Sequence, residues 1–300
     1  MKSPNRTRRL RRFTAGLFKE ALGRILVACR AHHWLLRGKV IVVTFHSVTR
    51  QSSDGTLRCS LEDFERYCAF FARHLRVETF TRVVERLQRH EPLNGELSVT
   101  FDDGYADNAE LALGVLGRWH LPATFFISTG FVESDTQSHW DQKANVRSRW
   151  MSWPQVAQLT AAGHEVGSHT VSHANLAELQ GADIASELRR SRDDLSMRAG
   201  IVPKHLAVPY GRRFPSLEQT VAIARDQGFA SVSLCRGGLA DHANSGQWIE
   251  RWPIDATAYL SPFGWIVDVI RDARALARVS PGSIPPPTSR ERLVTERTLR

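Results

Sequence analysis

The residues of this chain that could bind a metal ion or move protons come directly after apolar runs. Two adjacent acids, Asp102 and Asp103, follow the run Leu97–Phe101, and two histidines, His169 and His173, lie four residues apart in the stretch SHTVSH. Histidines at i and i+4 can lie on one face of a turn or helix and reach one ion. With a carboxylate from a neighbouring strand end they make a three-ligand site with open positions for water, an arrangement typical of catalytic zinc.

Two neighbouring carboxylates repel one another unless a positive charge offsets them. If one acid of the pair binds a dication, the other acid is free to act as a general base on metal-bound water. The metal lowers the pKa of that water toward about 7 and polarises a bound carbonyl group. Singly, Asp-Asp-Gly is most often a turn and His-x-x-x-His two surface histidines, but together they predict metal-assisted hydrolysis of an acyl group.

Other polar, aromatic and glycine residues also stand at or just after expected strand ends. These are His46 after the first strand, Arg251 just after a late strand, and Pro209, Tyr210 and Gly211 after a third. Trp140 lies in a loop after a strand, where its ring could stack on a sugar or could serve only in packing.

Segments of two periodicities alternate along the middle of the chain. Apolar runs typical of buried strands occur at 39–45, 97–101, 123–128, 164–169, 205–210 and 229–234. Segments with helical spacing occur at 60–74, 80–90, 108–120, 152–163, 182–199, 216–227 and 262–278. This alternation predicts an α/β fold with a parallel sheet and crossover helices. No Gly-x-Gly-x-x-Gly follows a strand, so a (β/α) barrel of eight or fewer units, with its chemistry at the carboxyl ends of strands, fits better than a Rossmann fold.

Basic residues gather at the two ends of the chain. The net charge is +9 over 300 residues, yet residues 1–39 hold eleven Lys or Arg against one Glu, and residues 271–300 hold seven Arg against three acids. The middle of the chain is therefore mildly acidic, which argues against a nucleic-acid-binding protein. The four cysteines are scattered and form no Cys-x-x-Cys pair, which argues against a disulfide framework and against a thiolate zinc site.

The N-terminal segment combines positive charge with a narrow apolar stripe. Charged residues interrupt every apolar run in it, namely Lys19, Glu20, Arg24 and Arg30, so neither a signal peptide nor a transmembrane helix is expected. The apolar stripe has helical spacing and consists of Phe18, Leu22, Ile25 and Cys29. This pattern fits a basic amphipathic helix on an anionic membrane surface. The alternative is a disordered basic arm followed by a helix that packs on the domain.

On these motifs the chain resembles the polysaccharide deacetylase family, also known as the NodB homology domain or family 4 carbohydrate esterases. TFDDGYADN is similar to its first motif, SHTVSH to its second, and LAVPYG to the aromatic-Pro-Tyr-Gly form of its third. LPATFFISTGF, MSWPQVAQLTAAGHEVGSH and ELRRSRDDL are similar to the family as well. The resemblance covers about residues 40–275. It implies a single-domain, distorted (β/α)7 TIM-like barrel, a divalent metal, and removal of an N- or O-acetyl group from a sugar.

The resemblance also implies roles for individual residues. Asp102 would be the general base, and Asp103, His169 and His173 would be the metal ligands. The backbone N–H of Tyr210 would help to hold the oxyanion, and the Pro-Tyr-Gly turn around it would contact substrate. The metal is expected to be zinc, although histidine and carboxylate ligands also suit cobalt and nickel.

Two features depart from the common family pattern. Ala207 stands where the third motif often has an Arg, and no Leu-x-x-His that would supply a general acid follows His242. IERWPID resembles the variant in which an Arg after a late strand, here Arg251, takes the orienting role. VTFHSV resembles the opening of exopolysaccharide-type members, in which His46 would stand near the metal as the general acid. Otherwise His46 is a strand-end histidine with a structural role.

We therefore expect a basic amphipathic arm at 1–38, a deacetylase barrel at 39–279 and a disordered tail at 280–300. The expected function is metal-dependent removal of acetyl groups from an N-acetylated glycan, either a polysaccharide or a lipid-linked sugar. The protein is expected in the cytoplasm or bound through its arm to the cytoplasmic face of a membrane, without a nucleic-acid partner. The alternative function is that of a catalytically weakened, carbohydrate-binding member of the same fold.

Overall fold

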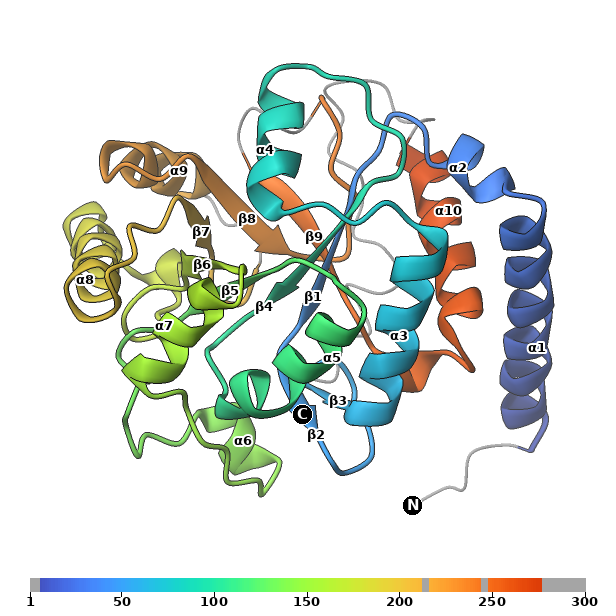
Figure 1. Ribbon diagram of the computed structural model, residues 1–300, viewed down its shortest axis with the longest axis horizontal. Helices are drawn as coiled ribbons and strands as arrows, with labels where there is room; N and C mark the ends of the chain where they lie inside the picture. Colours follow the sequence, from blue (N-terminus) through green and yellow to red (C-terminus); the bar gives the residue numbers. More distant parts are fainter. Residues whose placement is uncertain (1–5, 212–215, 244–247, 277–300) are drawn as a thin grey trace.

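Seven parallel strands form a closed barrel in the computed structural model, which describes residues 6–211, 216–243 and 248–276 (Figure 1). The strands follow chain order around the barrel, and the last pairs with the first to close it. They are β1 (Ile41–Phe45), β4 (Leu97–Phe101), β5 (Ala123–Ile127), β6 (Glu165–Ser168), β7 (His205–Ala207), β8 (Ser231–Cys235) and β9 (Ile249–Pro253). The predicted (β/α) barrel is confirmed, and it has seven strands.

The strands β1 and β4 set the level at which the barrel ends. Both are buried along their whole length, which explains why both read as unbroken apolar runs. They pair in register from Ile41 with Leu97 to Phe45 with Phe101, and the Asp102 N–H donates to the Phe45 carbonyl at 3.0 Å. The residues that follow these two strands therefore emerge side by side at the carboxyl end of the barrel.

Helices cover the outside of the barrel, and side-chain caps begin several of them. The helices are α1 (Arg6–Ala28), α2 (Ala31–Leu35), α3 (Leu61–His74), α4 (Phe80–Gln88), α5 (Leu113–Arg118), α6 (His139–Lys143), α7 (Trp153–Ala161), α8 (Gly181–Ala199), α9 (Leu217–Asp226) and α10 (Pro262–Leu276). Ser60 caps α3 by accepting from the Asp63 N–H at 3.1 Å. Ser152 and Gln155 form a reciprocal capping box at the start of α7.

The helix α4 closes the amino end of the barrel. Phe80 at its start packs edge-on against Phe126 and His205, and the Thr81 N–H donates to the Glu165 carboxylate at 3.2 Å. A negative charge at a helix N-terminus is favourable because it meets the positive end of the helix dipole. Glu165 and His205 begin β6 and β7, so α4 lies at the end of the barrel opposite the predicted chemistry.

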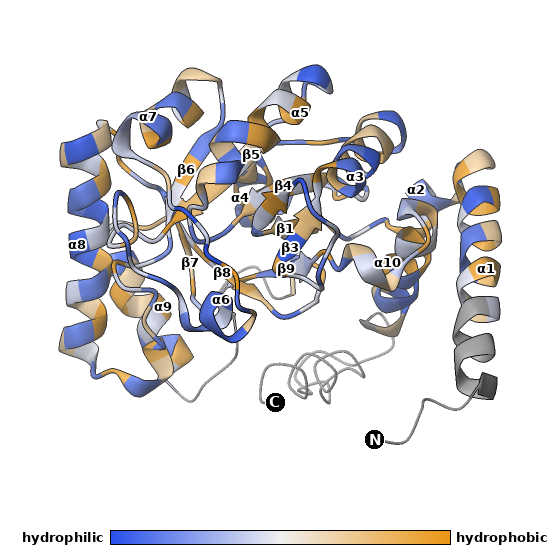
Figure 2. Ribbon diagram, turned by 90° about the horizontal axis from the view of Figure 1, so that it is seen from below, coloured by the Kyte–Doolittle hydropathy of each residue, from blue (hydrophilic) through white to orange (hydrophobic). Residues whose placement is uncertain are grey.

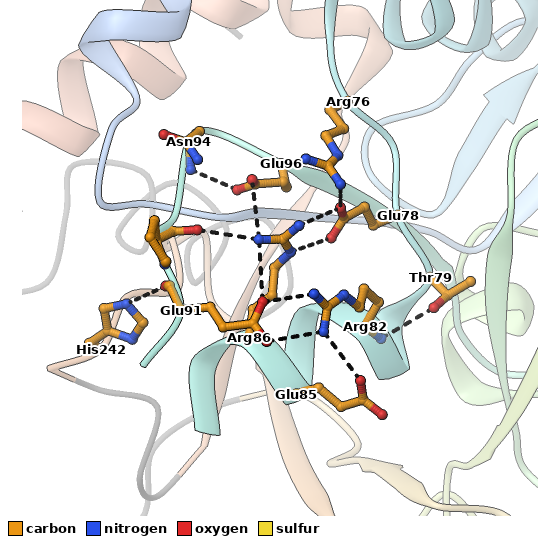
Figure 3. Close-up of polar contacts among 11 residues, drawn as sticks. Arg76, Glu78, Thr79, Arg82, Glu85, Arg86, Glu91, Asn94, Glu96 and His242 are labelled. Atoms are coloured by element: carbon orange, nitrogen blue, oxygen red, sulfur yellow. Dashed lines mark hydrogen bonds and ion pairs between the residues drawn. The ribbon is translucent and has the colours of Figure 1, made fainter. Parts of the chain in front are cut away.

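Ion pairs fix α4 to the segments on either side of it (Figure 3). Arg86 donates to both oxygens of Glu78 at 2.7 and 3.0 Å, and Arg82 pairs with Glu91 at 2.7 Å. Glu96 is almost fully buried just before β4 and lies 3.9 Å from Arg86. A buried carboxylate without a partner would be costly, so this cluster holds α4 against the start of β4.

The helix α1 lies along α10 on the outside of the barrel (Figures 1 and 2). Lys19 pairs with Asp268 at 2.8 Å. A Cβ atom at Gly23 would collide with the Phe263 carbonyl, so the two helices can approach this closely only because residue 23 is glycine. Among the described residues, no helix combines the length and the apolar character that crossing a membrane requires.

The apolar stripe of α1 faces away from α10. Phe18 is 68% exposed and Ile25 is 62% exposed, Cys29 is also exposed, and Leu22 is half-buried. Trp34 of α2 adds a further ring that is 60% exposed. Figure 2 shows apolar residues on α1 in orange. The helix therefore packs on the domain with one side and exposes the stripe on another.

The sequence prediction placed Arg251 wrongly. It was expected just after a late strand, but it lies inside β9. Glu250 accepts from Arg236 at 2.5 Å, whereas Arg251 is fully buried in the barrel. Charged side chains at two successive positions of this strand hide the apolar signal on which strand prediction depends.

Smaller differences concern the ends of elements and short elements. The strand predicted at 205–210 ends at Ala207, and the helix predicted at 108–120 begins with a π-helical turn, Asn108–Ala112, before α5. A two-stranded pair of β2 (Ser47–Thr49) and β3 (Arg58–Ser60) was not expected. The predicted tail at 280–300 lies outside the described residues.

Candidate active site

Three potential metal ligands converge at the carboxyl end of the barrel. Asp103 follows β4, and His169 and His173 follow β6. Asp103 Oδ1 lies 3.4 Å from His169 Nε2 and 3.3 Å from His173 Nε2, and all three side chains are buried. One donor atom from each residue lies within 4.8 Å of the other two, so a single ion could contact all three. The structure thus brings together the three residues that the sequence suggested as ligands.

The donor atoms of this cluster are available to a cation. His169 Nδ1 lies 2.8 Å from the Ala207 carbonyl oxygen, which favours the tautomer whose Nε2 lone pair points toward Asp103. Asp103 Oδ1 and His173 Nδ1 are buried without a hydrogen-bond partner among the described residues. An unpaired buried carboxylate oxygen beside two imidazole nitrogens fits a dication, which would satisfy it.

Burial and charge shift the pKa values of the three residues in different directions. Burial opposes ionisation of Asp103, but the neighbouring rings of His169 and His173 outweigh it and hold the pKa of Asp103 well below the usual range. Burial lowers the pKa of His173 and keeps the ring neutral. Burial also acts to lower the pKa of His169, yet the charges of Asp102 and Asp103 outweigh it and raise that pKa. The two carboxylates therefore favour positive charge at this point, which a bound dication would supply.

Asp102 does not join this cluster but pairs with Arg251. Arg251 Nη1 and Nη2 donate to the two carboxylate oxygens at 2.7 and 2.8 Å, and Nη1 also lies 3.2 Å from Thr100 Oγ1. Burial acts to raise the pKa of Asp102, but the charges of Arg251 and His169 lower it, so the residue stays ionised. The two adjacent acids thus have different partners, because successive residues at a strand end point in different directions.

His46 follows β1 and is half-buried beside the paired acids. It directly follows Phe45, which pairs with Phe101 just before Asp102, so His46 emerges at the same end of the barrel as the two acids. The Nδ1 atom is buried and has no hydrogen-bond partner in the described part of the chain. The next residue, Ser47, donates to Asp107 at 2.5 Å, which anchors this corner of the barrel.

The turn after β7 brings an aromatic ring to the ligand cluster. Tyr210 and Gly211 have left-handed backbones, with φ of 62° and 61°, and a Cβ atom at Gly211 would collide with the backbone of Cys235. The Tyr210 ring lies 4.9 Å from that of His173 and is 42% exposed. The Tyr210 N–H has no hydrogen-bond acceptor among the described residues, so it is available to a substrate oxygen.

The part of the chain that contains the three potential ligands, Asp102 and Tyr210 matches a known protein family, whereas His46 and Arg251 lie outside the matched residues. Residues 89–232 match the family model described as polysaccharide deacetylase. The chain contains a polysaccharide deacetylase domain. The resemblance that the sequence motifs indicated is therefore confirmed.

Curated relatives of the polysaccharide deacetylase domain carry related names. A chitin deacetylase from a Pestalotiopsis species is 34% identical over 38% of this chain and 33% of that protein. A peptidoglycan-N-acetylglucosamine deacetylase from Bacillus cereus is 28% identical over 46% of this chain and 43% of that protein. A chitooligosaccharide deacetylase from Sinorhizobium fredii is 26% identical over 62% of this chain and 68% of that protein. The chain thus spans less than half the length of the first two.

Solved structures share the fold of the polysaccharide deacetylase domain. The deacetylase PplD from Streptococcus pyogenes, solved in complex with acetate, superposes with a TM-score of 0.66 over 77% of this chain and 98% of that chain. IcaB from Ammonifex degensii superposes with a TM-score of 0.63 over 76% of this chain and 97% of that chain. The sequence identities are 20% and 22%, so these structures support the distorted seven-stranded barrel and nothing finer.

In this deacetylase domain Trp140 packs against one of the potential ligands. Its ring is half-buried, 4.6 Å from that of His173, and its Nε1 donates to the Tyr105 hydroxyl at 2.7 Å. That hydroxyl donates to Asp141 at 3.2 Å, and Arg58 pairs with Asp141 at 3.0 Å. Trp140 therefore has packing contacts, and because its ring is only half-buried, a role in packing and a contact with sugar both remain open as alternatives.

Sequence reasoning missed the three residues that hold Trp140 in place. Tyr105 belongs to the first motif, so its position alone could have drawn attention to it. Arg58 and Asp141 gave no such signal, because they lie 83 positions apart and each belongs to a short element that was not expected. Trp140 itself lies in the short helix α6 and not in the expected loop, and only the folded chain brings this buried ion pair to it.

Proposed function

We propose that this chain is a metal-dependent hydrolase that removes acetyl groups from an N-acetylated glycan. The observation that carries the proposal is the convergence of Asp103, His169 and His173 beside the separately held Asp102. Two histidines and one carboxylate are a common ligand set for catalytic zinc. The family match, and relatives named as deacetylases of chitin, chitooligosaccharide and peptidoglycan N-acetylglucosamine, support a glycan substrate.

Asp103, His169 and His173 would hold the metal. When bound, a dication at this point would polarise the acetyl carbonyl and lower the pKa of a water molecule toward neutrality. Zn²⁺ suits the ligand set, and Co²⁺ or Ni²⁺ would also fit it. The Ala207 carbonyl supports this role because it holds the His169 ring in the tautomer whose Nε2 can bind a metal.

Asp102 is the proposed general base. Each of its oxygens accepts one hydrogen bond from Arg251, which leaves further lone pairs to receive a proton from the attacking water. Its lowered pKa keeps the carboxylate ionised at neutral pH, which a base requires. Arg251 does not reach the substrate in this account but fixes the rotamer of Asp102, so it is a positioning residue.

His46 is the proposed general acid, and Tyr210 the proposed oxyanion donor. The water oxygen bonds to the acyl carbon, the C–N bond breaks, and the sugar amine leaves with a proton that His46 donates. The Nδ1 atom of His46, which lacks a partner among the described residues and lies at the end of the barrel that holds both acids, supports this role. The N–H of Tyr210, which has no acceptor in the described part of the chain, can stabilise the negative charge that develops on the acyl oxygen.

Aromatic rings around His173 are the proposed sugar contacts. Trp140 and Tyr210 lie 4.6 and 4.9 Å from the His173 ring on different segments of the chain. Aromatic faces provide large apolar surfaces that can pack on sugar rings. Pro209 and Gly211 would hold the turn that presents Tyr210. The proposed glycan is an N-acetylated polysaccharide or a lipid-linked sugar.

A carbohydrate-binding role without catalysis is the second candidate. It is favoured by Ala207, which replaces an Arg common in the family, and by the lack of a late Leu-x-x-His. The pair of Arg251 with Asp102 favours the catalytic function, because β9 supplies the guanidinium that the third motif lacks. The two candidates differ in one measurable product, which is acetate.

The proposed role of residues 1–38 is to bind the protein to an anionic membrane surface. They would attach the barrel, which comprises residues 39–279, to that surface. The exposure of Phe18 and Ile25 on α1 supports this function, because an apolar stripe flanked by basic residues inserts into the headgroup region. Basic side chains of the arm would add attraction to anionic lipids. The division into arm, barrel and a tail at 280–300 belongs to this proposal.

Acetate release from a panel of glycans tests the proposed function. The panel contains N-acetylglucosamine oligomers of several lengths, O-acetylated glycans and lipid-linked N-acetylated sugars, each with and without a chelator. The proposal expects acetate and free amine in equal amounts from at least one N-acetylated member, and loss of both with the chelator. Tight binding of oligomers by metal-loaded protein that releases no acetate would support the second candidate instead.

A further inference from the structure

The segment that carries His173 has an unfavourable backbone conformation. Thr170 and His173 both have left-handed backbones, with φ of 65° and 55°. Residues with a Cβ atom seldom adopt this conformation because it is sterically costly, and it persists only where the surroundings enforce it. The position of His173 therefore depends on what holds residues 169–173.

One side of this segment is held by the turn after β5. Ser128 Oγ, the Thr129 N–H and the Gly130 N–H donate in succession to the carbonyl oxygens of residues 169–171, at 3.1, 3.1 and 2.8 Å. A Cβ atom at Gly130 would press on the Val171 carbonyl, so the approach requires glycine there. The carbonyl side of the segment is thus fixed to the barrel.

The other side is held by a single carboxylate on α8. Glu187 Oε2 accepts from the Val171 N–H at 2.9 Å and from the Ser172 N–H at 3.0 Å, and Oε1 accepts from Ser172 Oγ at 3.0 Å. Two successive N–H groups that point at one anion form a concave binding site for it, and charge-assisted hydrogen bonds are the stronger kind. Both amides immediately before His173 therefore depend on Glu187.

We propose that Glu187 is a positioning residue for the metal site, and this rests on the proposed metal ligands. Its carboxylate holds the backbone of residues 171 and 172, and so keeps His173 Nε2 within 3.3 Å of Asp103 Oδ1. Glu187 itself contacts neither the ligand atoms nor the proposed substrate position. Partners that orient metal ligands in this way typically change metal affinity by about 10- to 100-fold when they are removed.

Metal affinity and amide hydrogen exchange of the full chain test this role. Zn²⁺ affinity is measured by competition with a chromophoric chelator for the wild type, Glu187→Ala and Glu187→Gln. The matched control is Asp193→Asn, because Asp193 is an exposed acid on the same helix without a hydrogen bond or ion pair in the described part of the chain. Exchange in residues 169–173 is followed in metal-free protein, and the unfolding temperature is recorded for every variant.

The proposal expects Glu187→Ala to weaken Zn²⁺ binding about 10- to 100-fold and to speed exchange in residues 169–173. Glu187→Gln, which keeps one acceptor oxygen, should lie between it and the wild type, and Asp193→Asn should match the wild type. Zn²⁺ affinity within twofold of wild type in Glu187→Ala would overturn the proposal, whatever its unfolding temperature. If Glu187→Ala does not fold, Glu187→Gln decides by the same two readouts.

Failure of the proposed metal site would look different. A wild-type chain that does not bind Zn²⁺, Co²⁺ or Ni²⁺ contradicts the ligand assignment. In that case the exchange experiment still reports on Glu187, because it uses metal-free protein. Unchanged exchange in residues 169–173 of both Glu187 variants would then show that this carboxylate does not fix the segment.

Discussion

Arg251 and Asp102 form two parallel hydrogen bonds, at 2.7 and 2.8 Å, in the fully buried interior of the barrel. The guanidinium comes from the middle of β9, and the carboxylate from the residue after β4. This pair separates the two adjacent acids, since Asp102 is engaged by a protein cation while Asp103 faces the two histidines. The proposed division between base and ligand depends on this separation.

Arg251→Lys tests how far this pairing matters for activity. A lysine keeps the positive charge but cannot donate two parallel hydrogen bonds, so Asp102 should lose its fixed orientation. We expect kcat to fall by about 10- to 100-fold, with Zn²⁺ still bound. Because Arg251 lowers the pKa of Asp102, weaker pairing should raise that pKa and move the acid limb of the pH–rate profile to higher pH. An unchanged profile would argue against Asp102 as the base.

His46→Ala tests the proposed general acid. Without a donor for the leaving amine, kcat should fall by on the order of 10²-fold. Substrates with a good leaving group, such as aryl acetates, need little protonation and should lose much less activity. Equal losses on amide and aryl ester substrates would return His46 to a structural role.

Because of His205, we expect the free energy of unfolding to depend on pH in a way that does not involve the active site. Burial lowers the pKa of His205 from 6.5 to about 4. As the pH falls, the unfolded chain therefore takes up a proton on this histidine before the native state does. The contribution of His205 to the free energy of unfolding is fully present above pH 6.5 and is lost as the pH falls toward 4. The loss is on the order of 3 kcal/mol, from about 1.4 kcal/mol per pKa unit.

Urea unfolding between pH 7.5 and 4.5 measures this effect. His205→Gln should lower stability at pH 7.5, because it removes the contact of the ring with Phe80, but should flatten the decline toward pH 4.5. Replacement of the exposed His120 by Asn is the control and should leave the slope unchanged. A His205→Gln curve parallel to the wild type would contradict the prediction.

The exposed stripe of α1 predicts binding to anionic vesicles. Phe18→Glu and Ile25→Glu together should abolish sedimentation with phosphatidylserine vesicles at low salt, because they remove apolar insertion and add negative charge. The wild type should dissociate in high salt as charges are screened. Met197→Glu is the matched control, since Met197 is 76% exposed on α8. A wild-type chain that stays in the supernatant would contradict the proposal.

Sequence patterns predicted those parts of the fold that are decided locally. β4 has the predicted bounds because Leu97–Phe101 is buried on both faces and therefore continuously apolar. Asp103, His169 and His173 were predicted to meet because parallel strands end at one side of a barrel. This rule on strand ends can be applied to a sequence without knowledge of side-chain packing.

Other features depend on contacts that no local pattern records. Arg251 was misplaced because a charged residue inside a barrel strand contradicts the apolar pattern, and its partner is 149 positions away. The clamp of Glu187 on Val171 is similar, because the two residues belong to separate elements and only backbone groups of one take part. Such polar contacts between separate segments form only when the chain folds into the barrel.

The central claim is that the adjacent acids have different tasks, and one paired measurement tests it most directly. Bound zinc and acetate release are measured together on an N-acetylated glycan for the wild type, Asp102→Asn and Asp103→Asn. We expect Asp102→Asn to retain zinc and to lose activity by on the order of 10²-fold or more, as loss of a general base does. Asp103→Asn should lose both zinc and activity. Equal loss of zinc in the two variants, or full activity of Asp103→Asn, would contradict the account.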